Sequence, residues 1–317
     1  MSEITFKLQL IQFVIYSVLF TYQLGHGQDF GYEGTIGPDF WGIKYRGCNG
    51  GKLQSPIDIE INNVKNVSYP PLIFKHFDEP LETVKLVNNG HTVQLSIQQG
   101  NIPSIGGGPL NSTYNFYQLH FHWGKNDSEG SENLINNHSF PLELHIVFYK
   151  TDYGNFSYAL GNDDGLTVLS FLYNKTDEEN KKYDQFEKEL PLVENFTSSI
   201  DIINFDSLDD FTTTDRTAYF TYHGSLTTPP CSEVVTWIEF ANTIPLSHEQ
   251  IQEFRLLSTY GGRLNHNFRP IQATNDRVIY MNVPQKSSSS SNYENQTHLL
   301  LILFLFQMYI YFYRMKS

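Results

Sequence analysis

The stretch Gln118-Leu119-His120-Phe121-His122-Trp123-Gly124 alternates between polar and apolar side chains, as a half-buried β-strand does. Residues two apart on a strand point to the same face, so His120 and His122 can both reach one metal ion. Further along, residues 142–148 alternate in the same way and carry His145, which a neighbouring strand could bring alongside. Three neutral imidazoles with an open fourth position are the ligand set of a catalytic zinc ion.

Two polar residues strengthen this interpretation. Gln118 and Glu143 each lie two residues before a histidine on the same strand face, where acceptors for the second imidazole N–H belong. A carboxylate inside an apolar strand is costly unless it is paired, and a role in orienting an imidazole explains Glu143. The alternative is that each histidine is a satisfied structural residue of the sheet.

Composition restricts the class of protein. The chain has 317 residues and a formal net charge of -13, and removal of its two ends leaves roughly 255 residues, enough for one large domain. No basic run is visible, which argues against nucleic-acid binding. The acidic balance fits a soluble surface and says little about substrate.

The N-terminal residues 1–27 resemble a secretory signal peptide, because Lys7 precedes an apolar run at residues 8–20 and Gly25 and Gly27 follow it. A signal anchor is the alternative, although the run is short for a membrane span. The number of N-glycosylation sequons supports a secretory glycoprotein. They begin at Asn66, Asn111, Asn126, Asn137, Asn155, Asn174, Asn195 and Asn295.

The chain has two cysteines, Cys48 and Cys231, which have one possible intramolecular pairing. In an oxidising compartment we expect them to form a disulfide. Free buried thiols are the alternative.

The C-terminus carries a second targeting signal. Small residues at 287–291 are followed by a polar spacer at 292–298 and a nearly continuous apolar run at 299–313. This order is typical of a GPI-attachment signal. The alternative is a single transmembrane helix, for which the run falls short of the ~20 residues that a bilayer needs. The predicted parts are thus a domain at 28–286, a Ser-rich linker and attachment region at 287–298, and a hydrophobic tail at 299–317.

Between the two ends the pattern predicts one mainly β (α+β) domain with short peripheral helices. Short alternating runs separated by Gly, Pro and Asn clusters predict strands at residues 84–87, 92–97, 117–123, 142–149, 219–222 and 234–240. Helical periodicity appears at 166–173, 183–193 and 247–257. Ser247 and Gln250 form a capping-box pattern at the start of the last of these.

The chain resembles the alpha-class carbonic anhydrases from about residue 31 to residue 283. The matching blocks are residues 31–34, 54–59, 88–91, 118–124, 130–132, 143–145, 224–230 and 267–270. The resemblance implies a large, mostly antiparallel twisted central sheet with one zinc ion in a conical cleft. The signal peptide, the cysteine pair and the C-terminal tail resemble the extracellular, membrane-anchored and GPI-linked branch of the family.

The resemblance also assigns the chemistry of carbon dioxide hydration. Zinc held by His120, His122 and His145 lowers the pKa of bound water to about 7, and the resulting zinc hydroxide attacks carbon dioxide to give bicarbonate. Thr227 would accept a hydrogen bond from the hydroxide and donate its own proton to Glu132. Sulfonamide-type inhibitors are expected by the same resemblance.

Substrate and proton-transfer residues follow in the same way. The family positions of the apolar wall for carbon dioxide are Val147, Val168, Leu226, Val235 and Trp237, and Thr228 would lie beside bicarbonate. His91 matches the proton shuttle, for which a pKa near 6.5–7 is suitable. Tyr32, Asn89 and Gln94 match positions that order the connecting waters.

The resemblance implies an acceptor for each metal-binding imidazole: Gln118 for His120, Glu143 for His145, and the backbone carbonyl of Asn267 for His122. The chain departs from the common family pattern at Gln94, where Asn is frequent, at Asn133, where His is frequent, and at Phe30, where Trp is frequent. The competing hypotheses are a catalytically silent, zinc-free binding module and a different zinc hydrolase. The latter is disfavoured because the chain has no HExxH motif.

Overall fold

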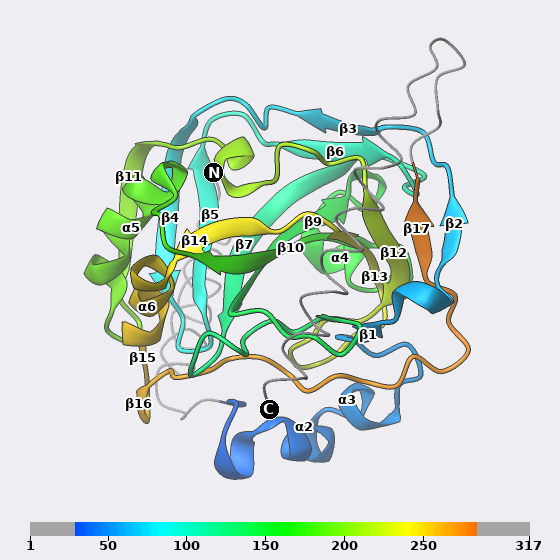
Figure 1. The fold of residues 1–317 in the computed structure, drawn as a ribbon, viewed down its shortest axis with the longest axis horizontal. Helices are drawn as coiled ribbons and strands as arrows, with labels where there is room; N and C mark the ends of the chain where they lie inside the picture. The colour runs from blue at the N-terminus through cyan, green and yellow to red at the C-terminus, as the bar shows by residue number, and fades with distance from the viewer. Residues whose placement is uncertain (1–28, 284–317) are drawn as a thin grey trace, which may run out of the picture. The chain divides into compact units, whose positions relative to one another are not determined.

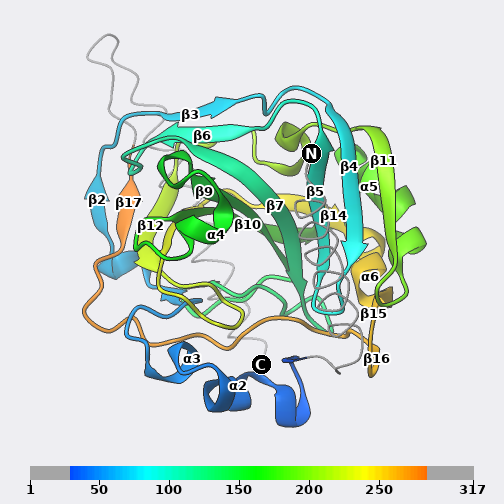
Figure 2. The same ribbon diagram turned by 180° about the vertical axis from the view of Figure 1, so that it is seen from behind.

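A 13-stranded sheet organises the computed structural model, which describes residues 29–283 (Figures 1 and 2). The predicted signal peptide and the predicted attachment region and tail lie outside these residues. Along its main path the sheet runs β11 (Ser199–Phe205), β4 (Leu81–Asn88), β5 (Val93–Gln99), β7 (Tyr114–Trp123), β9 (Leu142–Lys150), β10 (Leu166–Thr176), β13 (Val235–Phe240), β12 (Tyr219–Gly224), β17 (Tyr280–Asn282) and β2 (Lys65–Val67).

Most strand pairings in this sheet are antiparallel, as predicted. Among the described residues the parallel pairings are those of β10 with β13, of β10 with β14 (Ile244–Ser247), and of β17 with β2. The pair β3 (Leu72–Lys75) and β6 (Ser104–Gly107) extends the sheet from β7. Two small sheets stand apart, formed by β1 (Asp58–Ile59) with β8 (Leu134–Ile135) and by β15 (Ser258–Thr259) with β16 (Gly262–Arg263).

The six predicted strands are all present, and one predicted helix is wrong. Residues 166–173 form most of β10, whose side chains from Leu166 to Tyr173 are all buried. A continuous apolar run cannot be distinguished from a buried helix by periodicity alone. Strand pairing makes this segment a strand, because β9 and β13 flank β10 on its two sides and form hydrogen bonds with its backbone.

The helices are short and peripheral, as predicted. They are α2 (Pro38–Lys44), α3 (Gly47–Gly50), α4 (Phe156–Ala159), α5 (Asp184–Glu189) and α6 (His248–Leu256), with 3-10 turns η1 (Gly34–Ile36), η2 (Ile61–Asn63), η3 (Thr151–Tyr153), η4 (Lys181–Tyr183), η5 (Leu190–Val193) and η6 (Leu208–Phe211). Ser247 and Gln250 form the predicted capping box of α6. In both views α2 and α3 lie at the end opposite β3 and β6 (Figures 1 and 2).

The two faces of the sheet bury different clusters. Alternation along β13 places Ile238 and Phe240 in the larger cluster, with the side chains of α5 and α6. It places Val235 and Trp237 in the smaller cluster on the opposite face. The central strands are therefore buried on both sides, and a polar side chain that points into either layer needs a partner there. No helix within residues 29–283 is long and apolar enough to span a membrane.

Candidate metal centre

The register between β7 and β9 brings the three histidines together. His120 lies opposite His145, and His122 lies opposite Glu143. A register shift between Phe116 and Gln118 precedes this segment. One nitrogen of each imidazole can face a common point, since the three ligand atoms lie within 4.8 Å of one another. This is the only group of three or more metal-ligating side chains with such spacing among residues 29–283.

Each imidazole is held through its other nitrogen. Gln118 Oε1 lies 2.9 Å from His120 Nδ1, the carbonyl oxygen of Asn267 lies 2.8 Å from His122 Nδ1, and Glu143 Oε1 lies 2.8 Å from His145 Nε2. A carbonyl or carboxylate oxygen only accepts, so the held nitrogens of His122 and His145 carry the protons. The nitrogens that face the common point are then His120 Nε2, His122 Nε2 and His145 Nδ1.

The spacing of two bare nitrogens fits a metal ion. His122 Nε2 and His145 Nδ1 are 3.0 Å apart, and in these tautomers neither has a proton to donate to the other. A cation between them resolves the contact: Zn–N bonds of about 2.0–2.1 Å in tetrahedral geometry separate two nitrogens by about 3.3 Å. Burial, together with the neighbouring imidazoles, lowers the pKa of His120 well below its usual value and that of His122 to about 3. His120 and His122 are therefore neutral, as zinc requires of its imidazole ligands.

The Glu143 carboxylate receives donors on both oxygens. Oε2 accepts from the backbone N–H groups of Glu132 and Asn133 at 2.7 and 2.8 Å. Oε1 accepts from His145, from Asn133 Nδ2 at 2.9 Å and from Ser170 Oγ at 2.7 Å. Burial alone would raise the pKa of Glu143, but His145 and the hydrogen bonds lower it below its usual value. The anion is thus the form that the surroundings stabilise.

Glu132 lies on the other side of the imidazoles. Its Oε1 accepts from the backbone N–H of Arg269 at 2.8 Å, and its Oε2 lies 3.4 Å from His122 Nε2. Burial and the charge of Glu143 raise the pKa of Glu132 well above its usual value, while hydrogen bonding to the Thr227 side chain acts in the opposite direction. The Glu132 Oε2 atom, which faces the metal-binding nitrogens, has no hydrogen-bond partner among residues 29–283 and is open to the Thr227 hydroxyl.

An apolar wall borders the same site. Register aligns Val147 with Val168 and Val168 with Trp237, and the Trp237 ring centroid lies 4.8 Å from that of His145. The predicted wall residues gather in the smaller cluster, where Val147, Val168, Val235 and Trp237 are buried and Leu226 packs against them. Thr228 is half-buried in the loop that follows Thr227.

His91 is less prepared for proton transfer than the sequence indicates. Its ring stacks on Phe30 with centroids 3.8 Å apart, and its buried Nδ1 has no hydrogen-bond partner among residues 29–283. Burial lowers its pKa to about 4, against the expected 6.5–7. The flat face of Phe30, which stands where the family frequently has Trp, accounts for the difference because it shields the ring from water.

The residues predicted to order waters lie around His91 and His120. Asn89 Oδ1 accepts from the backbone N–H groups of His91 and Thr92 at 2.9 and 3.0 Å, which fixes the turn. Gln94 on β5 is paired with His120 on β7. The Tyr32 side chain is buried, and its residue lines a surface hollow together with Gly90 and His266.

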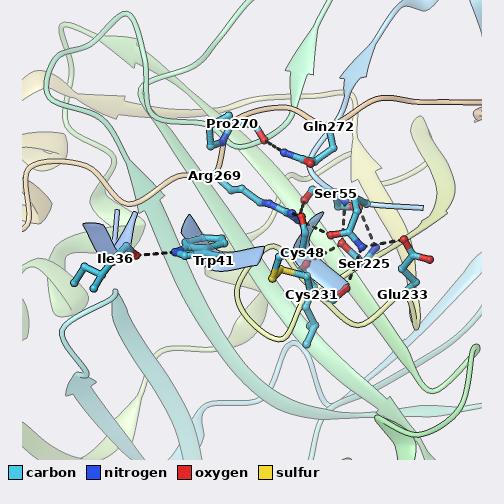
Figure 3. The surroundings of a disulfide bond; sticks show 12 residues. Ile36, Trp41, Cys48, Ser55, Ser225, Cys231, Glu233, Arg269, Pro270 and Gln272 are labelled. Carbon is cyan, nitrogen blue, oxygen red and sulfur yellow. Dashed lines mark hydrogen bonds between the residues drawn. A yellow bond between two sulfur atoms is a disulfide. The ribbon is translucent and has the colours of Figure 1, made fainter. Parts of the chain in front are cut away.

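The predicted disulfide between Cys48 and Cys231 is present, and it anchors the loop that carries Thr227 (Figure 3). Arg269 lies beside it, and its guanidinium donates to the Cys48 carbonyl at 2.8 Å and to Ser55 O at 2.8 Å. Arg269 therefore connects the disulfide region with Glu132, which its backbone N–H contacts. No role for Arg269 was predicted from the sequence, where it stands between Phe268 and Pro270.

Comparisons with known proteins agree with this geometry. The family described as eukaryotic-type carbonic anhydrase matches residues 36–283, and the chain belongs to that family. Carbonic anhydrase 6 of Bos taurus is 34% identical over 256 residues, which cover 79% of this chain and 79% of that protein. Carbonic anhydrase 6 of Homo sapiens is 33% identical over 271 residues, which cover 83% and 86% respectively.

The membership confirms the predicted enzyme class, and the three histidines confirm the predicted site for one zinc ion. The fold is that of the predicted mainly β domain. Membership in a GPI-linked branch stays a prediction.

Proposed function

We propose that this protein catalyses the reversible hydration of carbon dioxide to bicarbonate and a proton at the outer surface of the cell. The observation that carries the proposal is the set of three imidazoles, each held through one nitrogen by an acceptor and each with its other nitrogen toward one point. When zinc is bound by His120, His122 and His145, it lowers the pKa of a coordinated water to about 7 and supplies the nucleophile.

Thr227 and Glu132 would direct the attack. Glu132 would accept the Thr227 hydroxyl proton, and the lone pairs of the Thr227 oxygen would then be left to accept a hydrogen bond from the nucleophile. This fixes the direction of the hydrogen bonds and aims an electron pair at the substrate. Arg269, through its backbone N–H, holds Glu132 in place for that role.

The apolar wall would hold the substrate. Carbon dioxide is apolar, so side chains that offer no hydrogen bonds hold it without competition from water. The proposed wall residues are Val147, Val168, Leu226, Val235 and Trp237. Thr228, in the adjoining loop, would neighbour bicarbonate. Aromatic sulfonamides should bind at the same place and inhibit the enzyme.

Turnover then requires a proton to leave. We assign this step to His91, reached through waters ordered by Tyr32, Asn89 and Gln94. The ring must leave Phe30 to carry a proton at neutral pH, because in the stacked position its pKa is about 4. The turn at residues 89–91 is held by the Asn89 side chain, so the movement would be a rotation of the ring about its own side-chain bonds.

Stopped-flow measurement of carbon dioxide hydration, with zinc content measured on the same purified protein, tests the proposal. Fast hydration with one zinc per chain, lost on chelation, is the expected result. One zinc without hydration would contradict the catalytic assignment. A folded protein without zinc would contradict the histidine assignment and favour the silent binding module. An activated ester that turns over faster than carbon dioxide would favour a different hydrolase.

The proposed location rests on the sequence of the two ends. A signal peptide at residues 1–27 and a GPI-attachment signal formed by 287–317 would place the domain outside the cell. Release from intact cells by a phosphatidylinositol-specific phospholipase is the expected result. Attachment that persists after complete digestion of a control GPI protein would favour a transmembrane anchor.

The same location predicts glycosylation. Several sequon asparagines have exposed side chains, including Asn66 on β2 and Asn195 after η5. Treatment with an endoglycosidase should lower the apparent mass of the protein from its native source. An unchanged mass would contradict the predicted glycans.

A further inference from the structure

A second carboxyl group lies buried behind the metal centre. Glu239 continues the row of Val235 and Trp237 along β13, and the register places it opposite Ser170 on β10 and Phe220 on β12. It is fully buried, and no ion pair to it is present within residues 29–283. A buried carboxyl without a cation needs another way to lower its cost.

Asn133 connects Glu239 to Glu143. Its Oδ1 accepts from the backbone N–H of Ile57 at 3.2 Å and from the Tyr222 hydroxyl at 3.0 Å, which fixes the orientation of the amide. The two protons of Nδ2 then go to Glu143 Oε1 at 2.9 Å and Glu239 Oε2 at 3.1 Å. One amide therefore bridges two carboxyl groups in a site closed to solvent.

Two carboxylates that share a buried site cannot both be ionised at low cost, so one proton must reside on one of them. Both Glu143 oxygens are filled with donors, as described above. Glu239 Oε2 has the single donor from Asn133, and Oε1 has no hydrogen-bond partner of either kind among residues 29–283. The donors thus favour Glu143 as the anion and leave Glu239 with the proton. Burial and the charge of Glu143 raise the pKa of Glu239 well above its usual value, in agreement.

Ser170 is the hydroxyl residue that the register of β10 with β13 places opposite Glu239, and it offers an acceptor for that proton. Its hydroxyl donates to Glu143 Oε1 at 2.7 Å. A hydroxyl that donates in one direction can accept from the other. The tyrosine hydroxyl of Tyr222, which also faces this cluster, is already directed at Asn133.

We propose that Glu239 is a positioning residue for the zinc ligand His145 and acts as a neutral carboxylic acid. Its Oε2 accepts from Asn133 Nδ2, and a rotation of the carboxyl group would direct its Oε1–H to Ser170 Oγ, the residue opposite it on β10. Ser170 and Asn133 are thereby held so that each donates a hydrogen bond to Glu143. Glu143 in turn holds the His145 ring with Nδ1 toward the metal. The proposal rests on the proposed function only in taking the three histidines as a zinc centre.

Three variants test whether the Glu239 side chain is a neutral carboxylic acid or an ionised carboxylate. Glu239→Gln keeps the shape, an acceptor for Asn133 and a donor for Ser170, whereas Glu239→Leu keeps the volume and removes both. Ser170→Ala removes the link to Glu143 while leaving Glu239 in place. Acceptors that contact a metal-bound histidine directly are typically worth 10–100-fold in metal affinity. We expect roughly threefold to tenfold weaker zinc binding for Glu239→Leu and Ser170→Ala, since Glu239 acts through a further bond.

The first measurement is an infrared difference spectrum between metal-free wild-type protein and metal-free Glu239→Gln at neutral pH. The carbonyl stretching band of a protonated carboxyl group should be present in the wild type and absent from the variant. The second is zinc affinity by competition with a chelator, in which Glu239→Gln should stay within about twofold of wild type, well inside the 10–100-fold scale of a lost acceptor. Neither measurement depends on hydration activity, so their outcome is separate from that of the proposed reaction.

Absence of the band, or equal loss of zinc affinity in Glu239→Gln and Glu239→Leu, would overturn the proposal, because an ionised Glu239 cannot be replaced by a neutral amide. If Glu239→Leu does not fold, the infrared band and the Ser170→Ala affinity still decide. Unchanged zinc affinity in Ser170→Ala would also overturn it.

Discussion

The metal centre and the proposed proton exit of this protein are both predicted by short motifs, yet the structure prepares them to different degrees. Each imidazole of the metal centre is fixed through its second nitrogen by an acceptor 2.8–2.9 Å away. The imidazole of His91 has a stacking partner but no partner for Nδ1 among residues 29–283. A ligand must stay in one orientation, whereas a proton carrier must leave its resting place, so the looser arrangement suits the second role.

The largest expected effect is at the metal centre. His120→Ala should abolish zinc binding and hydration together, because two imidazoles leave a site with too few ligands. Zinc content and stopped-flow rates on the same sample provide the test. His138→Ala, outside the cluster, is a matched control that should retain both. Stoichiometric zinc in His120→Ala would refute the ligand assignment.

Removal of a buried hydrogen-bond acceptor should weaken zinc binding without abolishing it. Glu143→Gln replaces an anion that accepts five hydrogen bonds by an amide whose NH₂ group cannot accept. Zinc affinity should fall by roughly 10–100-fold. Gln118→Ala is the milder comparison, since His120 is only half-buried and water can replace the lost acceptor. Chelator competition measures both, and an effect of Gln118→Ala larger than that of Glu143→Gln would reverse the ranking.

The proton exit should respond to buffer rather than to zinc. His91→Ala should lower maximal turnover roughly tenfold in weak buffer, with zinc content unchanged, and added imidazole should restore part of it. Turnover that does not change in weak buffer would show that another residue carries the proton.

The stacking partner of His91 allows a finer test. Phe30→Ala should raise the pKa of His91 from about 4 toward 6.5, because the ring gains access to water. An NMR titration of the His91 ring protons in both proteins measures this directly. A wild-type pKa already near 6.5 would mean that the ring spends most of its time off Phe30.

The smallest expected effect is on stability. Folding lowers the pKa of His91 from 6.5 to about 4, so the unfolded chain binds the proton more readily between these values. The neutral ring therefore contributes stability that is present above pH 6.5 and is lost as the pH falls toward 4. His91→Ala should show a shallower loss of unfolding free energy between about pH 7 and about pH 5 in urea titrations. Identical slopes would indicate that rotation of the ring absorbs the whole effect.

The sequence predicted the metal centre well because strand alternation and motif spacing fix which side chains share a face. Alternation alone placed His120 and His122 together, and the register with β9 added His145. The pKa of His91 was not predictable, since it depends on which side-chain rotamer packs against Phe30. Glu239 was overlooked although the rule applied to Glu143, that a carboxylate in an apolar strand needs a partner, applies equally to it. Its partners Asn133 and Ser170 come from distant segments that only the folded chain brings together.

The acceptor of His122 has a consequence for biosynthesis. The three ligands lie on adjacent strands, so this part of the chain emerges from the ribosome as one segment. Asn267 is supplied much later, and it contributes both the carbonyl that holds His122 and side-chain hydrogen bonds to the backbone of Phe121, Trp123 and His91. A nascent chain therefore carries every zinc ligand long before it can orient them all. Durable zinc retention should then coincide with completion of the domain, which makes metal loading a late checkpoint in the maturation of this protein.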